Sequence, residues 1–226
     1  MSEMITLPEG FTVTGHSGCE NTQENSLECI EKAYESGADI AEIDLNFDGD
    51  IPVLSHNAPH GGEVTLDEAF ALLAKCGNMK MNVDVKNTAN MGEVIKLAEK
   101  HGVTERIFFT GVTDGFVPAV RDLGIPYYLN TDVFAPRTHC KKYINSLIEK
   151  VRKSGAVGIN MHHSKLGKRL SQAFHEEGLL VSVWTVNKEK AMKKALAARP
   201  DNITTRKPLL LLEVIKGETQ GRNLTK

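Results

Sequence analysis

The feature that most constrains the fold is a regular alternation of extended and helical patterns along the chain. Apolar runs with strand character alternate with stretches whose apolar residues recur at helical spacing. There are about eight such pairs, the number that closes a (β/α)8 barrel. We expect strands over residues 11–14, 38–46, 79–86, 106–110, 126–130, 156–161, 179–186 and 202–205, with a short extended return over 51–55. We expect helices over residues 24–37, 66–73, 91–101, 116–123, 139–153, 166–177, 188–198 and 209–215.

Length and composition favour one α/β domain, a TIM (β/α)8 barrel over residues 1–226, since no linker or low-complexity tract interrupts the pattern. The formal net charge of −2 favours neither nucleic acid nor an anionic membrane as a partner, so any phosphate recognition must be local. The four cysteines lack C-x-x-C spacing and are expected to be free thiols. No signal peptide is visible and residues 209–212 are too short to span a bilayer, so we expect a cytoplasmic protein without a stable membrane anchor.

Three carboxylates are expected to converge at neighbouring strands. Glu42 and Asp44 alternate with apolar residues, so both point to one face of their strand. Asp84 and Lys86 share a face of a further strand in the same way. Such an all-oxygen cluster suits a hard divalent cation, Mg²⁺ or Ca²⁺. The competing interpretation is that the acids pair with lysines on a solvated rim.

Two histidines lie near these acids at the ends of expected strands. His16 stands in the segment Gly-His-Ser-Gly after the first strand, and His56 follows residues 51–55. Histidine transfers protons near neutral pH, so one on each side of a phosphate can act as an acid/base pair. The other six histidines are interpreted as structural.

Further side chains at strand ends are candidates for binding substrate. Lys86 is suited to contact a phosphate or carboxylate as a point charge. Trp184, the only tryptophan, either fills the core or forms a wall of the pocket. Glu24 and Asn25 could simply begin a helix, or could contact substrate or hold His16.

The chain resembles the glycerophosphodiester phosphodiesterase family, within the phospholipase C-like TIM-barrel phosphodiesterases. The family pattern H-R-G, P-E-N-T, G-x-D-x-x-E-x-D, D-G-x-P-V-x-x-H-D, E-x-K and W-T-x-N is matched in order by residues 16–18, 23–26, 37–44, 50–57, 84–86 and 184–187. The resemblance implies a TIM barrel with His16 and His56 as the acid/base pair. It also implies that Glu42, Asp44 and Asp84 are metal ligands.

The chain departs from the family pattern at several positions. Ser17 replaces the arginine that follows the first histidine, and Asp84 stands where most members have glutamate, similar to the D-x-K of sphingomyelinase D toxins. Arg206 occurs where the usual pattern near the C-terminus is T-D-x-P. Because the last strand of a closed barrel lies beside the first, we hypothesise that Arg206 replaces the guanidinium lost at Ser17.

The resemblance therefore predicts metal-dependent hydrolysis of a glycerophosphodiester to glycerol 3-phosphate and an alcohol. One alternative is a phosphodiesterase for another headgroup or a lysolipid, and another is a barrel that binds phosphodiesters without turnover. The choice between Mg²⁺ and Ca²⁺, the nature of the nucleophile and the oligomeric state are left open by the sequence.

Overall fold

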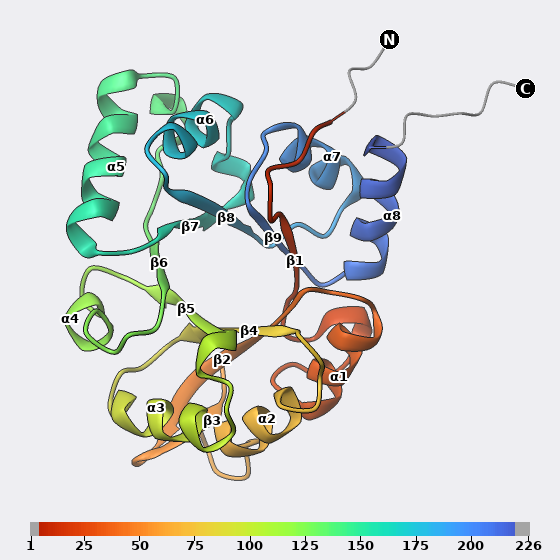
Figure 1. Ribbon diagram of the computed structural model, residues 1–226, viewed down its shortest axis with the longest axis vertical. Helices are drawn as coiled ribbons and strands as arrows, with labels where there is room; N and C mark the ends of the chain where they lie inside the picture. The colour runs from red at the N-terminus through yellow and green to blue at the C-terminus, as the bar shows by residue number, and fades with distance from the viewer. Residues whose placement is uncertain (1–4, 220–226) are drawn as a thin grey trace, which may run out of the picture.

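The computed structural model describes residues 5–219, whose parallel strands close into a barrel (Figure 1). Closure follows because β1 pairs in parallel with both β2 and β9. The parallel strands are β1 (Thr12–Gly15), β2 (Ile40–Asp48), β4 (Lys80–Val85), β5 (Ile107–Val112), β6 (Tyr127–Asn130), β7 (Gly158–His162), β8 (Leu180–Trp184) and β9 (Asn202–Thr205). The predicted TIM barrel is confirmed.

The helices form an outer ring around the strands (Figure 1). They are α1 (Leu27–Glu35), α2 (Leu66–Leu73), α3 (Met91–Lys100), α4 (Val117–Val120), α5 (Lys141–Ser154), α6 (Lys168–Glu176), α7 (Glu189–Ala197) and α8 (Pro208–Thr219). Strand β3 (Ile51–Leu54) is the expected short return and pairs antiparallel with β2.

Helix α4 is shorter than the predicted 116–123. Beyond Val120 the backbone tightens, because the N–H of Leu123 donates to the carbonyl of Val120, three residues back, and Gly124 then takes a φ of 75°. A single helical turn is left. Helix α1 begins at Leu27, after the N-cap Ser26, and so is shorter than the expected 24–37. Thr65 and Glu68 form the predicted capping box at the start of α2, which satisfies two backbone donors.

Strand β2 explains how polar groups reach the barrel interior. Ile43 and Leu45 are at most 1% exposed and belong to the hydrophobic core that includes the surrounding helices. The alternate residues Glu42 and Asp44 therefore face the inside of the barrel. Since all eight parallel strands run the same way, their carboxyl ends gather such polar side chains on one face.

Candidate active site

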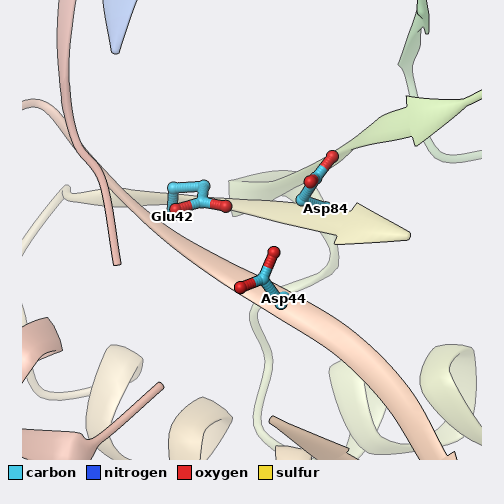
Figure 2. Close-up of side chains that lie close together, drawn as sticks. All are labelled: Glu42, Asp44 and Asp84. Atoms are coloured by element: carbon cyan, nitrogen blue, oxygen red, sulfur yellow. The ribbon is translucent and has the colours of Figure 1, made fainter. Parts of the chain in front are cut away.

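Three carboxylates meet where β2 and β4 run side by side (Figure 2). The strand register pairs Asp44 with Asp84, and Glu42 lies two residues earlier on the same face of β2. One oxygen from each carboxylate lies within 4.8 Å of the others. Glu42 and Asp44 are only 4% and 3% exposed. The cluster predicted from the alternation is therefore assembled in the fold.

The charges in this cluster are unequal. Burial, together with repulsion by Asp44 and Asp84, raises the pKa of Glu42 well above its usual value. Burial alone would also raise the pKa of Asp44, but the charge of Lys86 and hydrogen bonds from Asn25 and Lys86 lower it. The Lys86 ammonium lies 3.0 Å from Asp44 Oδ1 and also contacts Asp84. One lysine thus faces three acids, which leaves an excess of negative charge. A set of oxygen donors with this excess fits a hard divalent cation.

Asp84 is held by its neighbours on β5. Thr110 Oγ1 lies 2.8 Å from Asp84 Oδ1 and 2.8 Å from Asn82 Oδ1, and its hydroxyl can donate to either oxygen. The next residue, Gly111, has a φ of 72°, and a Cβ there would lie 2.6 Å from Asp84 Oδ1. Only glycine can therefore occupy this position without displacing the carboxylate.

His16 follows β1 and lies at the wall of this cluster. Its Nδ1 is 2.9 Å from the carbonyl oxygen of Ser17, which can only accept, so Nδ1 carries the proton and Nε2 is left as the basic nitrogen. Burial lowers the pKa of His16, although the Ser17 carbonyl opposes this effect. A neutral imidazole of this kind can accept a proton.

His56 follows β3 on the other side of Asp44. Its Nδ1 lies 3.3 Å from Asp44 Oδ1, and the ring is largely exposed. A carboxylate at Nδ1 orients the ring and leaves Nε2 available for proton transfer. The two predicted histidines are therefore brought to the same carboxylate cluster.

Asn25 links the first loop to β2. Its side chain donates to Asp44 Oδ2 and accepts from the Asp44 backbone N–H, both over 2.9 Å. Its own backbone N–H donates to Ser17 Oγ over 2.6 Å, and its φ is 56°. Asparagine tolerates this left-handed conformation better than most residues. Asn25 thus holds a carboxylate of the cluster rather than simply beginning α1.

These groups surround a cavity of about 550 Å³ at the carboxyl-terminal face of the barrel. Trp184 forms part of its wall and is 37% exposed, so it does not fill the core. Sequence reasoning did not assign a role to several other lining residues, although most stand at strand ends where polar side chains gather. They are Asn82, Thr110, Asn130 and Asn160.

Comparison with known proteins agrees with this geometry. The family model described as "Glycerophosphoryl diester phosphodiesterase family" matches residues 65–210, which is more than half of the chain. The chain belongs to the glycerophosphoryl diester phosphodiesterase family. It is thus a phosphoric diester hydrolase of a family that depends on a divalent metal. A search among curated proteins finds no match.

Solved structures share the barrel of this phosphodiesterase. A phosphodiesterase from Oleispira antarctica, in complex with the product sn-glycerol-3-phosphate, aligns with a TM-score of 0.76 and 18% identity over 93% of this chain and 98% of that one. An Agrobacterium tumefaciens glycerophosphodiester phosphodiesterase gives 0.73 and 16% over 92% and 100%. The Thermotoga maritima enzyme gives 0.67 and 20% over 90% and 98%. At these identities the likeness concerns the fold alone.

Arg206 of the phosphodiesterase lies beside His16, as the closed barrel predicts. The His16 backbone N–H donates to the carbonyl of Thr205, and Arg206 Nε lies 3.5 Å from His16 Nδ1. The guanidinium also pairs with Glu24, and both side chains line the cavity. A guanidinium is therefore present next to the histidine that precedes Ser17.

Proposed function

We propose that the chain hydrolyses glycerophosphodiesters to glycerol 3-phosphate and an alcohol, with His16 and His56 as its acid/base pair. Glu42, Asp44 and Asp84 are proposed to hold the divalent cation, Mg²⁺ or Ca²⁺. The observation that carries the proposal is that both histidines have Nδ1 held by an oxygen acceptor beside one carboxylate cluster. Each ring therefore has Nε2 available for proton transfer.

A bound divalent cation would polarise a phosphate oxygen and stabilise negative charge as it develops there. The residues of the chain supply the proton transfers. One histidine takes the proton of the attacking hydroxyl as its oxygen bonds to phosphorus, and the other gives a proton to the leaving alcohol oxygen as its bond to phosphorus breaks. The attacking hydroxyl belongs to water or to the neighbouring glycerol hydroxyl, the latter route passing through a cyclic phosphate that water then opens.

The remaining site residues are proposed to bind and orient the substrate. Lys86 and Arg206 supply positive charge on the two sides of His16 and the carboxylates. Glu24 positions Arg206, and Asn25 positions Asp44. Trp184 offers an apolar wall to the carbon skeleton of the substrate.

The proposal is tested by release of glycerol 3-phosphate from glycerophosphocholine and glycerophosphoethanolamine, with Mg²⁺, with Ca²⁺ and with chelator. We expect metal-dependent release that is lost in His16→Ala and His56→Ala, while His139→Ala, an exposed histidine outside the cavity, remains active. A cyclic phosphate detected during turnover by ³¹P NMR would identify the glycerol hydroxyl as nucleophile. Full activity in both site variants would contradict the assigned roles.

Ser17 favours a second candidate, hydrolysis of another headgroup or of a lysolipid. It removes the arginine that the family pattern places after the first histidine, and with it a bidentate phosphate donor. A panel of diesters that vary in the alcohol and in acylation of the glycerol separates the two. Preference for acylated substrates would favour this candidate.

A further inference from the structure

We propose that one side of the barrel rim docks reversibly on an anionic lipid surface. This side, the basic rim, consists of residues 131–142, 162–169 and 184–190. These segments follow β6, β7 and β8 and lead into α5, α6 and α7, which are neighbours in the outer ring (Figure 1). They lie on the same face of the barrel as the cavity.

The basic rim carries a strong local charge. It contains eight cations and two acids, a net charge of +6, so the rest of the chain carries −8 within the total of −2. The cations are Arg137, Lys141, Lys142, Lys165, Lys168, Arg169, Lys188 and Lys190. The low charge of the whole chain, which gave no reason to expect an anionic membrane, therefore averages two regions of opposite sign.

These cations are available to a partner. All but Lys165 are exposed. Within residues 5–219 none of the eight forms an ion pair with a carboxylate, whereas Lys86, Lys100 and Arg206 each do. Their charge is therefore neutralised only by solvent ions, and a negatively charged surface can replace those ions.

The cations at the starts of α5 and α6 lie where a helix is stabilised by acids. Helices α5 and α6 begin with Lys141 and Lys168, and neither has an acid in its first turn. The helices on the other side of the barrel follow the usual pattern, with Glu28, Asp67 and Glu93 in the first turns of α1, α2 and α3. Because the N-terminus of a helix carries positive partial charge, cations there destabilise it. Helix stability thus does not explain the cations at the starts of α5 and α6, whereas α7 begins with the acid Glu189.

Exposed aromatic rings accompany the charge. Phe134 is 57% exposed, with the Arg137 guanidinium 5.8 Å from its ring centroid. Trp184 is 37% exposed and packs edge-on against His162 at 5.5 Å. Aromatic rings flanked by cations are suited to the boundary between lipid headgroups and acyl chains. Since Trp184 also lines the cavity, the basic rim extends to the mouth of the site.

The chemistry of the cavity favours lipid over other polyanions. This step rests on the proposed function, because a pocket that cleaves glycerophosphodiesters recognises the group that links a lipid headgroup to its glycerol. No helix in residues 5–219 has the length and apolar character needed to cross a bilayer. The binding we propose is therefore peripheral, carried by charge and by the two rings.

The test is sedimentation of the full chain with vesicles of phosphatidylcholine alone and of phosphatidylcholine mixed with phosphatidylglycerol. The variant Lys168→Glu/Arg169→Glu reverses two charges of the basic rim. The matched control, Lys75→Glu/Lys80→Glu, reverses two exposed cations, one shortly after α2 and one at the start of β4, on the opposite face of the barrel. Both variants have the same net charge.

We expect the wild-type chain to bind the mixed vesicles and to be released by high salt. The rim variant should bind the mixed vesicles at least about 25-fold more weakly, since each of the two basic residues contributes roughly a fivefold factor near such a surface. The control variant should bind like wild type. Phe134→Ser, which keeps every charge, should also weaken vesicle binding but leave binding to heparin unchanged.

Three results would overturn the proposal. They are no binding of wild type to the mixed vesicles, equal losses in the two charge-reversal variants, or vesicle binding that Phe134→Ser leaves unchanged. Vesicle binding is measured without turnover, and hydrolysis of soluble glycerophosphocholine is measured separately on the same proteins. Hydrolysis without vesicle binding would contradict the docking proposal alone. Vesicle binding without hydrolysis would contradict the proposed function alone.

Discussion

The backbone N–H of Ser17 donates to Glu42 Oε2 over 2.7 Å, which ties the loop after β1 to the carboxylate cluster on β2. The Ser17 hydroxyl extends this link by accepting from the backbone N–H of Asn25. Asn25 in turn holds Asp44. Ser17 is 1% exposed. The residue that departs from the family pattern is therefore a buried connection between two of the proposed metal ligands.

Ser17→Ala should destabilise this connection. It leaves the partly buried Asn25 N–H without its acceptor, and an unpaired donor costs about 1–3 kcal/mol where it is fully buried. We expect a corresponding fall in the free energy of unfolding in urea and weaker metal binding. Ser146→Ala, at an exposed serine of α5, should change stability by less than about 0.5 kcal/mol. An unchanged urea midpoint for Ser17→Ala would argue against the link.

Ser17→Arg should fail to improve the enzyme, even though it restores the family pattern. The serine side chain is enclosed and points to Asn25, so a guanidinium there must displace that contact. We expect lower stability, by about 1–3 kcal/mol, and lower hydrolysis of glycerophosphocholine. Higher activity at unchanged stability would show that the cavity accepts a second guanidinium.

Arg206→Ala should weaken phosphate binding. A charged hydrogen bond contributes about 1.5–3 kcal/mol, so we expect the affinity for sn-glycerol 3-phosphate to fall roughly tenfold or more. Titration calorimetry measures this directly. Arg199→Ala, at an arginine that does not line the cavity, provides the control. The idea that Arg206 replaces the missing arginine fails if Arg206→Ala retains both activity and phosphate affinity.

Glu42→Gln should stabilise the metal-free chain while abolishing its metal binding. Glu42 is buried beside two further carboxylates, and its raised pKa reflects that unfavourable environment. The amide keeps an oxygen that can accept from the Ser17 N–H. We expect a gain of about 0.5–2 kcal/mol in metal-free unfolding experiments and no calorimetric heat with Mg²⁺ or Ca²⁺. Asp114→Asn, at an exposed acid outside the cluster, should show neither effect.

Lys168→Glu should stabilise α6. An acid in the first turn interacts favourably with the helix dipole where a lysine does not, a difference of about 0.3–1 kcal/mol at low salt. Urea unfolding at low and high ionic strength measures the gain, which salt should reduce. A loss of stability at low salt would mean that Lys168 makes a favourable contact in the folded chain.

Much of the site could be predicted because it depends on local periodicity. Alternation in β2 placed Glu42 and Asp44 on one face, and strand ends placed His16 and Trp184 on one rim. The closed barrel also placed Arg206 near His16. The catalytic and binding roles of these residues remain predictions that the experiments above test.

Other features could not be predicted because they depend on where flexible side chains come to lie. Lys86 was expected to contact a phosphate or a carboxylate, and only the folded structure places its ammonium between Asp44 and Asp84. Nothing in the local pattern indicates that Ser17 would accept a hydrogen bond from Asn25, or that Gly111 must leave room for Asp84. Such contacts join segments whose separation in the sequence does not indicate how close their side chains lie in the folded structure.

The sequence by itself determined the barrel, its order of strands and helices, and which residue types lie at the carboxyl-terminal rim, because hydrophobic period and capping act over a few neighbouring residues. Tertiary structure decided which of those rim residues touch one another. Pairing of β1 with β2 brings the Ser17 N–H to Glu42, a contact that the sequence did not indicate. The parallel pairing of β6 with β7 and of β7 with β8 places the cations that follow these strands on one side of the barrel. Distances across a barrel are set by packing and strand register, which no local pattern encodes.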